Sequence, residues 1–210
     1  MLMFSDIVIP KNNKESEFIE IGLRLGIKKI YFLYNYGEHG IEELQAKSKL
    51  GEIHKNMSVE YGFIVNEKNI NNALKETRLI VSKSSDLDKF FIESQKIRLI
   101  YGFEDTDKRD SLHQRAAGLN HTLCELAKKN NIAIGFSYGS LFGKGAQTTS
   151  ILLGRMMQNI KLCQKYKVQT KIASFSEDPF GIRLPHDVIS LFTILGMDRN
   201  KAKESLTIDI

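Results

Sequence analysis

Short apolar runs alternate with segments of helical periodicity along the whole chain. The runs are rich in Ile, Val, Phe and Tyr, and several are apolar at successive positions, as in strands covered on both faces. They predict strands at residues 3–9, 29–33, 59–65, 78–81, 99–103, 132–137 and 170–173. Apolar residues at helical spacing between these runs predict helices at 16–25, 41–50, 70–75, 87–94, 119–130, 151–166, 187–195 and about 198–206.

The repeated alternation of strand and helix, with no break in composition, predicts one parallel sheet, either closed as a barrel or doubly wound. No G-x-G-x-x-G segment follows the first strand, and the units are evenly spaced, which disfavours the doubly wound alternative. We therefore expect an α/β fold, a TIM-barrel-like (β/α) barrel that forms a single domain over residues 1–210.

The composition is that of an ordinary soluble globular protein, with 42% hydrophobic and 26% charged residues. The two cysteines, Cys124 and Cys163, lie among apolar residues and are expected to be reduced core thiols. No apolar run approaches the roughly 18 residues of a membrane-spanning helix, and the first residues lack the basic segment of a signal peptide. These features predict a cytoplasmic protein with no membrane partner.

Positive charge is concentrated in the second half of the chain. Residues 106–210 carry 15 Lys and Arg against 9 Asp and Glu, whereas residues 1–105 carry 15 against 16. Residues 126–176 contain eight Lys and Arg and no acidic residue, although 25 acids in 210 residues would place about six there. This pattern predicts a surface for a polyanion, and its alternative is the solvated face of ordinary helices.

The expected helices place part of this charge on their outward faces. In helix 151–166 the apolar positions share one face, which leaves Lys161 and Lys165 on the opposite side with Arg155 near the edge. The preceding helix leaves His121 outward in the same way. The outward lysines of the two helices are Lys128, Lys129, Lys161 and Lys165.

No spacing in the sequence supports a metal site on the protein. The five histidines form no H-x-H or H-E-x-x-H pair, and the cysteines form no C-x-x-C pair. The first strand offers only Asp6, which we expect to be a hydrogen-bonded residue at the strand end rather than a ligand.

A glycine-rich loop at residues 139–145 follows the sixth strand and contains Lys144. The G-x-x-x-x-G-K-[ST] spacing fails because glycine follows Lys144, yet such a loop at a barrel mouth could still hold phosphate. The alternative is a mobile connection between strand and helix.

The polar segment 104–121 is the most unusual part of the chain. Its Arg115 could pair with Asp110 or bind a phosphate or carboxylate. His113 and His121 have no evident nucleophile or orienting group nearby, so no catalytic residue is predicted.

Several segments in succession carry a family resemblance. They are RAAGLNH at 115–121, AKKNNIAIG at 127–135, NIKLCQKYKV at 159–168, LPHD at 184–187 and LGM at 195–197. In this order they resemble the ribonuclease P protein component 3 family, the archaeal counterpart of a eukaryotic nuclear subunit. The likeness is strongest over 98–200, and the acidic run 104–110 departs from the family pattern.

The resemblance implies a TIM-barrel-like fold related to metal-dependent barrel phosphohydrolases but without their metal site. It implies an endoribonuclease subunit of the ribonucleoprotein that removes the 5′ leader from precursor tRNA. The RNA subunit and its magnesium ions would perform the cleavage, and the isolated chain, which binds no cofactor, would be inactive. Partners would be the catalytic RNA, precursor tRNA indirectly, and another small protein subunit in a heterodimer or heterotetramer.

The RNA-binding positions that the resemblance implies are Arg98, Arg115, His121, Lys165 and Arg183. The charge pattern adds Lys129 and Lys161, and the glycine-rich loop adds Lys144. Two alternatives remain: a stand-alone barrel metallohydrolase or phosphate-ester enzyme using the glycine-rich loop, and a protein-interaction scaffold without RNA contact.

Overall fold

Seven parallel strands form the centre of the computed structural model, which describes residues 3–49, 57–106, 109–111 and 115–207. The strands pair in sequence order, each with the next. They are β1 (Ser5–Val8), β2 (Lys29–Asn35), β3 (Ser58–Ile64), β4 (Ile80–Lys83), β5 (Leu99–Tyr101), β6 (Ala133–Ser137) and β7 (Thr170–Ala173). Each predicted strand is confirmed, with ends that shift by a few residues.

The last strand returns to the first, so the sheet is nearly closed. Val8 forms an isolated parallel bridge with Ser176. The Phe175 amide donates to the Ile7 carbonyl at 2.8 Å, and the Ile9 amide donates to the Ser176 carbonyl at 2.8 Å. The predicted TIM-barrel-like fold is therefore confirmed, with seven strands in the described residues.

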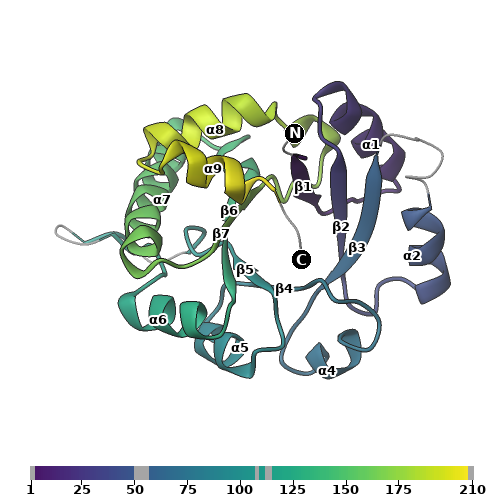
Figure 1. Cartoon of the computed structure of the whole chain (residues 1–210), viewed down its shortest axis with the longest axis horizontal. Coiled ribbons are helices and arrows are strands. Elements are labelled where there is room, and N and C mark those ends of the chain that lie inside the picture. Colours follow the sequence, from purple (N-terminus) through teal and green to yellow (C-terminus); the bar gives the residue numbers. More distant parts are fainter. Residues whose placement is uncertain (1–2, 50–56, 107–108, 112–114, 208–210) are drawn as a thin grey trace.

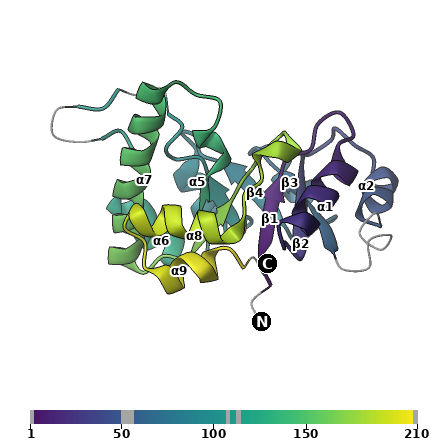
Figure 2. The same cartoon turned by 90° about the horizontal axis from the view of Figure 1, so that it is seen from above.

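Helices form a ring around the strands (Figure 1). Figure 2 shows α1 and α2 on the opposite side of the barrel from α7. The helices are α1 (Glu15–Arg24), α2 (Ile41–Ser48), α4 (Ile70–Ala73), α5 (Asp88–Ser94), α6 (His121–Lys129), α7 (Ala146–Tyr166), α8 (Pro185–Ile194) and α9 (Arg199–Ser205). Two short 3₁₀ helices, η1 (Gly139–Leu141) and η2 (Pro179–Gly181), follow β6 and β7.

Helix α7 begins five residues before the predicted start, directly after the glycine-rich loop. Gly145 takes an extended conformation at its N-terminus, and the Ser150 hydroxyl donates to the Ala146 carbonyl at 2.9 Å. A serine whose hydroxyl bonds the carbonyl four residues earlier lies inside a helix. The first turn of α7 is polar, so hydrophobic periodicity alone placed the start of the helix too late.

Two apolar clusters account for strands that are apolar on both faces. The inner cluster fills the barrel, where Tyr101 stacks on Phe175 with ring centres 4.0 Å apart. The outer cluster lies between the strands and the helices and includes the buried free thiols Cys124 and Cys163. Alternate residues of each strand point to the two clusters, as the period of a strand requires.

Asp6 helps to join the first and last strands. One carboxylate oxygen accepts hydrogen bonds from the Ser174 and Ile7 amides, at 2.6 and 2.9 Å, and the other accepts from the Tyr138 hydroxyl at 2.9 Å. Complete burial raises the pKa of Asp6 to about 6, although these hydrogen bonds oppose the shift. The prediction that Asp6 is hydrogen-bonded is confirmed, although Asp6 is the second residue of β1 and not a residue at its carboxyl end.

Candidate functional site at the barrel mouth

A cavity of about 780 Å³ opens where the carboxyl ends of the strands meet. Functional sites of parallel barrels lie at this end because the loops after the strands converge there. Charged and hydroxyl side chains line the cavity. The cations are Lys11, Lys83, Lys144 and Arg183, the acids are Glu104, Asp105, Glu177 and Asp178, and the serines are Ser137, Ser140 and Ser176.

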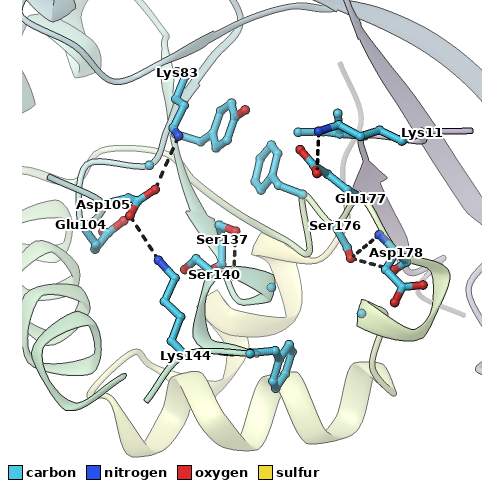
Figure 3. Close-up of a pocket in the computed structure, with 18 of the residues that line it drawn as sticks. Lys11, Lys83, Glu104, Asp105, Ser137, Ser140, Lys144, Ser176, Glu177 and Asp178 are labelled. Carbon is cyan, nitrogen blue, oxygen red and sulfur yellow. Dashed lines mark hydrogen bonds and ion pairs between the residues drawn. The ribbon is translucent and has the colours of Figure 1, made fainter. Parts of the chain in front are cut away.

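Two lysines from separate elements meet at one carboxylate. Lys83, at the end of β4, and Lys144, from the glycine-rich loop, both point toward Asp105, with Nζ to carboxylate distances of 3.5 and 3.3 Å (Figure 3). Partial burial acts to raise the pKa of Asp105, but the two ammonium groups outweigh it and hold the pKa below its usual value. Two cations against one anion leave an excess positive charge that favours an anionic ligand.

The other side of the cavity carries a separate ion pair. Lys11 lies 2.7 Å from Glu177, and both side chains are more than half exposed. An exposed pair of this kind contributes little to stability, so both groups stay available to a ligand.

Helix α7 holds the segment between β5 and α6 against the barrel through Arg155. The guanidinium donates to the carbonyls of Glu104 and Thr106, each at 2.9 Å, and to the Asp110 carboxylate at 2.9 Å. The prediction that Arg155 lies near the edge of an exposed face is wrong, because its side chain is only 7% exposed. The polar segment between β5 and α6 packs over the Arg155 side chain. The helical periodicity of α7 cannot predict which distant segment packs on a given face.

A second polar residue of α7 extends this contact. The buried Asn159 amide donates to the Glu104 carboxylate and to the Ala117 carbonyl, both at 2.8 Å. Burial raises the pKa of Glu104 to about 7, with the hydrogen bond from Asn159 opposing the shift. The described acids of this segment therefore act within the fold: Glu104 is buried, Asp105 pairs with lysines and Asp110 pairs with arginines.

The structure divides the eight predicted RNA-binding residues between the two ends of the barrel. Four lie on loops or helix starts that follow strand carboxyl ends, and we call them the mouth cations: Arg115, His121, Lys144 and Arg183. Four lie near strand amino ends, at the start of β5, the end of α6 and the last third of α7. We call these the amino-end cations: Arg98, Lys129, Lys161 and Lys165.

The two groups differ in how far the fold already engages their charges. Arg115 lies 3.6 Å from Asp110, one of the two kinds of partner that the sequence left open, and Lys144 contacts Asp105. The amino-end cations are all exposed and form no ion pair within the described residues. Among the mouth cations, His121 is likewise exposed and without an ion pair in the described residues.

The acid-free stretch 126–176 is less uniform on the surface than in the sequence. Lys171 is buried at the amino end of the barrel interior, where Nζ donates to the Thr207 carbonyl at 2.8 Å. With Arg155 also buried, two of the eight cations in the stretch take no part in a surface. The outward positions of Lys128, Lys129, Lys161 and Lys165 are confirmed.

Sequence reasoning missed part of the mouth. Lys83 shares the inward strand parity of Val81, so strand periodicity could have placed it inside the barrel at the carboxyl end. Lys11 lies on a loop and Phe180 in the three-residue helix η2, where no periodic signal exists. His113 lies outside the described residues.

Within the described residues, no group of three His, Cys, Asp or Glu side chains could hold a metal ion. No helix in the described ranges is both long and apolar enough to cross a membrane.

Residues 109–209 match the family model described as RNase P subunit p30. The Ribonuclease P protein component 3 of Methanococcus maripaludis (strain C6) is 26% identical over 179 residues, which cover 83% of this chain and 75% of that protein. The Ribonuclease P protein component 3 of Thermococcus kodakarensis is 35% identical over 89 residues, which cover 42% of this chain and 40% of that protein.

Solved structures show the same barrel. A chain of an archaeal ribonuclease P, determined by cryo-electron microscopy with mature tRNA, has a TM-score of 0.79 at 19% identity and covers 96% of this chain and 87% of its own length. The crystal structure of an uncharacterized protein has a TM-score of 0.53 at 10% identity, covering 98% and 72% of the two chains.

Proposed function

We propose that this chain is a protein subunit of ribonuclease P, because residues 109–209 match the family model described as RNase P subunit p30 and the relatives it resembles are named Ribonuclease P protein component 3. That ribonucleoprotein removes the 5′ leader from precursor tRNA. The observation that carries the proposal is the family match over residues 109–209, the half of the chain that contains most of the predicted RNA-binding residues.

We propose that the amino-end cations bind phosphates of the catalytic RNA. They are exposed and form no ion pair within the described chain. They lie on neighbouring elements, since α6 packs on α7 and β5, which Arg98 directly precedes, pairs with β6. Cations placed in this way neutralise phosphates and release the counterions condensed on them. Such contacts position the RNA backbone and leave selectivity to RNA shape.

We propose that the RNA performs the cleavage with its own magnesium ions and that this chain alone is inactive. In this arrangement the protein stabilises the folded RNA together with a second small protein subunit, and precursor tRNA is contacted indirectly. Support comes from the barrel mouth, where the charged groups near the cavity are paired with one another.

Reconstitution of the ribonucleoprotein tests the RNA contact. Replacing Lys129, Lys161 and Lys165 together by alanine should weaken RNA binding and lower the slope of log K against log salt by about 2–3, because each lost phosphate contact removes roughly 0.7–0.9 from it. A matched control replaces three exposed lysines on or beside α4 and α5: Lys68, Lys75 and Lys89.

The control variant should keep the salt slope and the RNA footprint of the unaltered chain. If both triple variants bind alike, the amino-end cations do not contact the RNA. If the isolated chain instead hydrolyses RNA or phosphate esters with a divalent metal, the proposed division of labour between RNA and protein is wrong.

A further inference from the structure

Two exposed phenylalanines lie at the edge of the mouth cavity. Phe180 is 74% exposed and Phe142 is 41% exposed, and both line the cavity. Phenylalanine is ordinarily a buried residue, so two exposed rings at one rim leave an unusual apolar surface in contact with solvent.

Ordered backbone carries both rings. Phe180 is the central residue of η2, where the Asp178 side chain accepts a hydrogen bond from its amide at 3.4 Å. Phe142 directly follows η1 and packs edge-on against Tyr138, with ring centres 6.5 Å apart. A ring on ordered backbone loses little conformational freedom when a ligand stacks on it.

Arg183 contacts the Phe142 ring and the backbone of Phe180. Its guanidinium lies over the Phe142 ring, 4.1 Å from the ring centre, while Nη1 donates to the Phe180 carbonyl at 2.5 Å and to the Ile182 carbonyl at 2.9 Å. These bonds use Nη1, and the guanidinium makes no other bond within the described residues. The hydrogens on Nε and Nη2 therefore remain available to an anionic group.

The surrounding charge favours an anionic ligand with a flat apolar part. Lys144 lies two residues after Phe142 and lines the same cavity. The two acids nearest this rim each face a lysine in an exposed ion pair: Glu177 lies 2.7 Å from Lys11 and Asp178 lies 3.9 Å from Lys14.

We propose that Phe142, Phe180 and Arg183 form a stacking platform for an unpaired nucleotide of RNA, with the base on the Phe180 ring and the phosphate near Arg183 and Lys144. The proposal rests on the proposed function, which brings RNA to this chain. Any base can stack on an aromatic ring, and arginine supplies both a stacking plane and a cation. An apolar protein surface docking here would have to desolvate that arginine, which disfavours a protein occupant.

Photocrosslinking identifies the class of molecule that covers the platform. The full chain carries p-azidophenylalanine at position 180, or at position 90 as the control, in ribonuclease P reconstituted with its RNA and protein partner. Phe90 is a suitable control because it is 45% exposed and lies on α5, away from the cavity. We expect an RNA adduct at an unpaired nucleotide from position 180 and none from position 90. An adduct to the partner protein, to a paired nucleotide, or to nothing overturns the proposal.

Affinity measurements with the reconstituted RNA add a second readout. Phe180→Ala should weaken binding about tenfold with an unchanged salt slope, and Phe180→Trp should retain affinity, because stacking contributes about that much per base. Phe180→Leu should resemble the alanine variant, since leucine is apolar but cannot stack. Full affinity for Phe180→Leu or Phe180→Ala would overturn the platform. The unaltered chain separates the two proposals: if it fails to bind the RNA at all, the proposed function itself fails.

Discussion

Replacing Arg155 by methionine tests whether α7 holds the segment between β5 and α6 in place. Methionine keeps most of the apolar length of the side chain and removes the guanidinium. The change deletes bonds to two carbonyls and to the Asp110 carboxylate, each 2.9 Å long. The carboxylate is left 20% exposed and without its nearest cation.

The expected loss follows from these contacts. Removing one partner of a buried ion pair costs about 3–5 kcal/mol, and water entering a loosened segment recovers part of that. We therefore expect the free energy of unfolding to fall by about 3 kcal/mol. For a chain of this size the melting temperature should fall by roughly 6–12 °C.

Urea unfolding followed by circular dichroism measures the global loss, and hydrogen exchange measures the local one. The Ala116 amide, which donates to Asp110 at 2.8 Å, should exchange faster in the variant. The control is Lys161→Met on the same helix, where an exposed side chain without an ion pair in the described residues should change stability by no more than about 0.5 kcal/mol. A loss below about 1 kcal/mol with unchanged Ala116 exchange would refute the assigned role of Arg155.

Two further substitutions probe this part of the fold. Because burial raises the pKa of Glu104 to about 7, the folded state binds this proton more tightly than the unfolded state, and the resulting stability is lost as pH rises through 7. The free energy of unfolding of Glu104→Gln, measured in urea, should therefore rise relative to that of the unaltered chain by up to about 3 kcal/mol between about pH 5 and pH 8.5. If the difference between the two free energies stays constant over this range, Glu104 does not titrate there. At Gly118, φ is +76° and an added Cβ would lie 2.5 Å from the Phe103 carbonyl oxygen, whereas Gly26 has the same φ and no atom within 4 Å. Gly118→Ala should lower the free energy of unfolding by at least about 2 kcal/mol and Gly26→Ala by about 1 kcal/mol, and equal losses would refute the steric argument.

The periodic parts of the chain could be predicted because their information is local. Strand and helix periods depend on neighbours within a few residues, so the seven strands, the barrel and the outward lysines of α6 and α7 follow from the sequence. The hydrogen-bonding role of Asp6 could be predicted, since a lone carboxylate without neighbouring ligands cannot form a metal site. The family resemblance, carried by segments in a fixed order, implied the RNA.

The tertiary structure decided which long-range partners meet. Arg155 and Lys161 are both cations of one helix, yet a segment some fifty residues earlier in the chain covers Arg155 and leaves Lys161 in water. The meeting of Lys83, Asp105 and Lys144 likewise depends on the end of β4 and two loops converging at one end of the barrel. Charge and hydrophobicity along a chain determine which faces can be buried. Which segment buries each face is decided only when distant parts of the chain pack together. A side-chain contact depends on position in space rather than on spacing in the sequence.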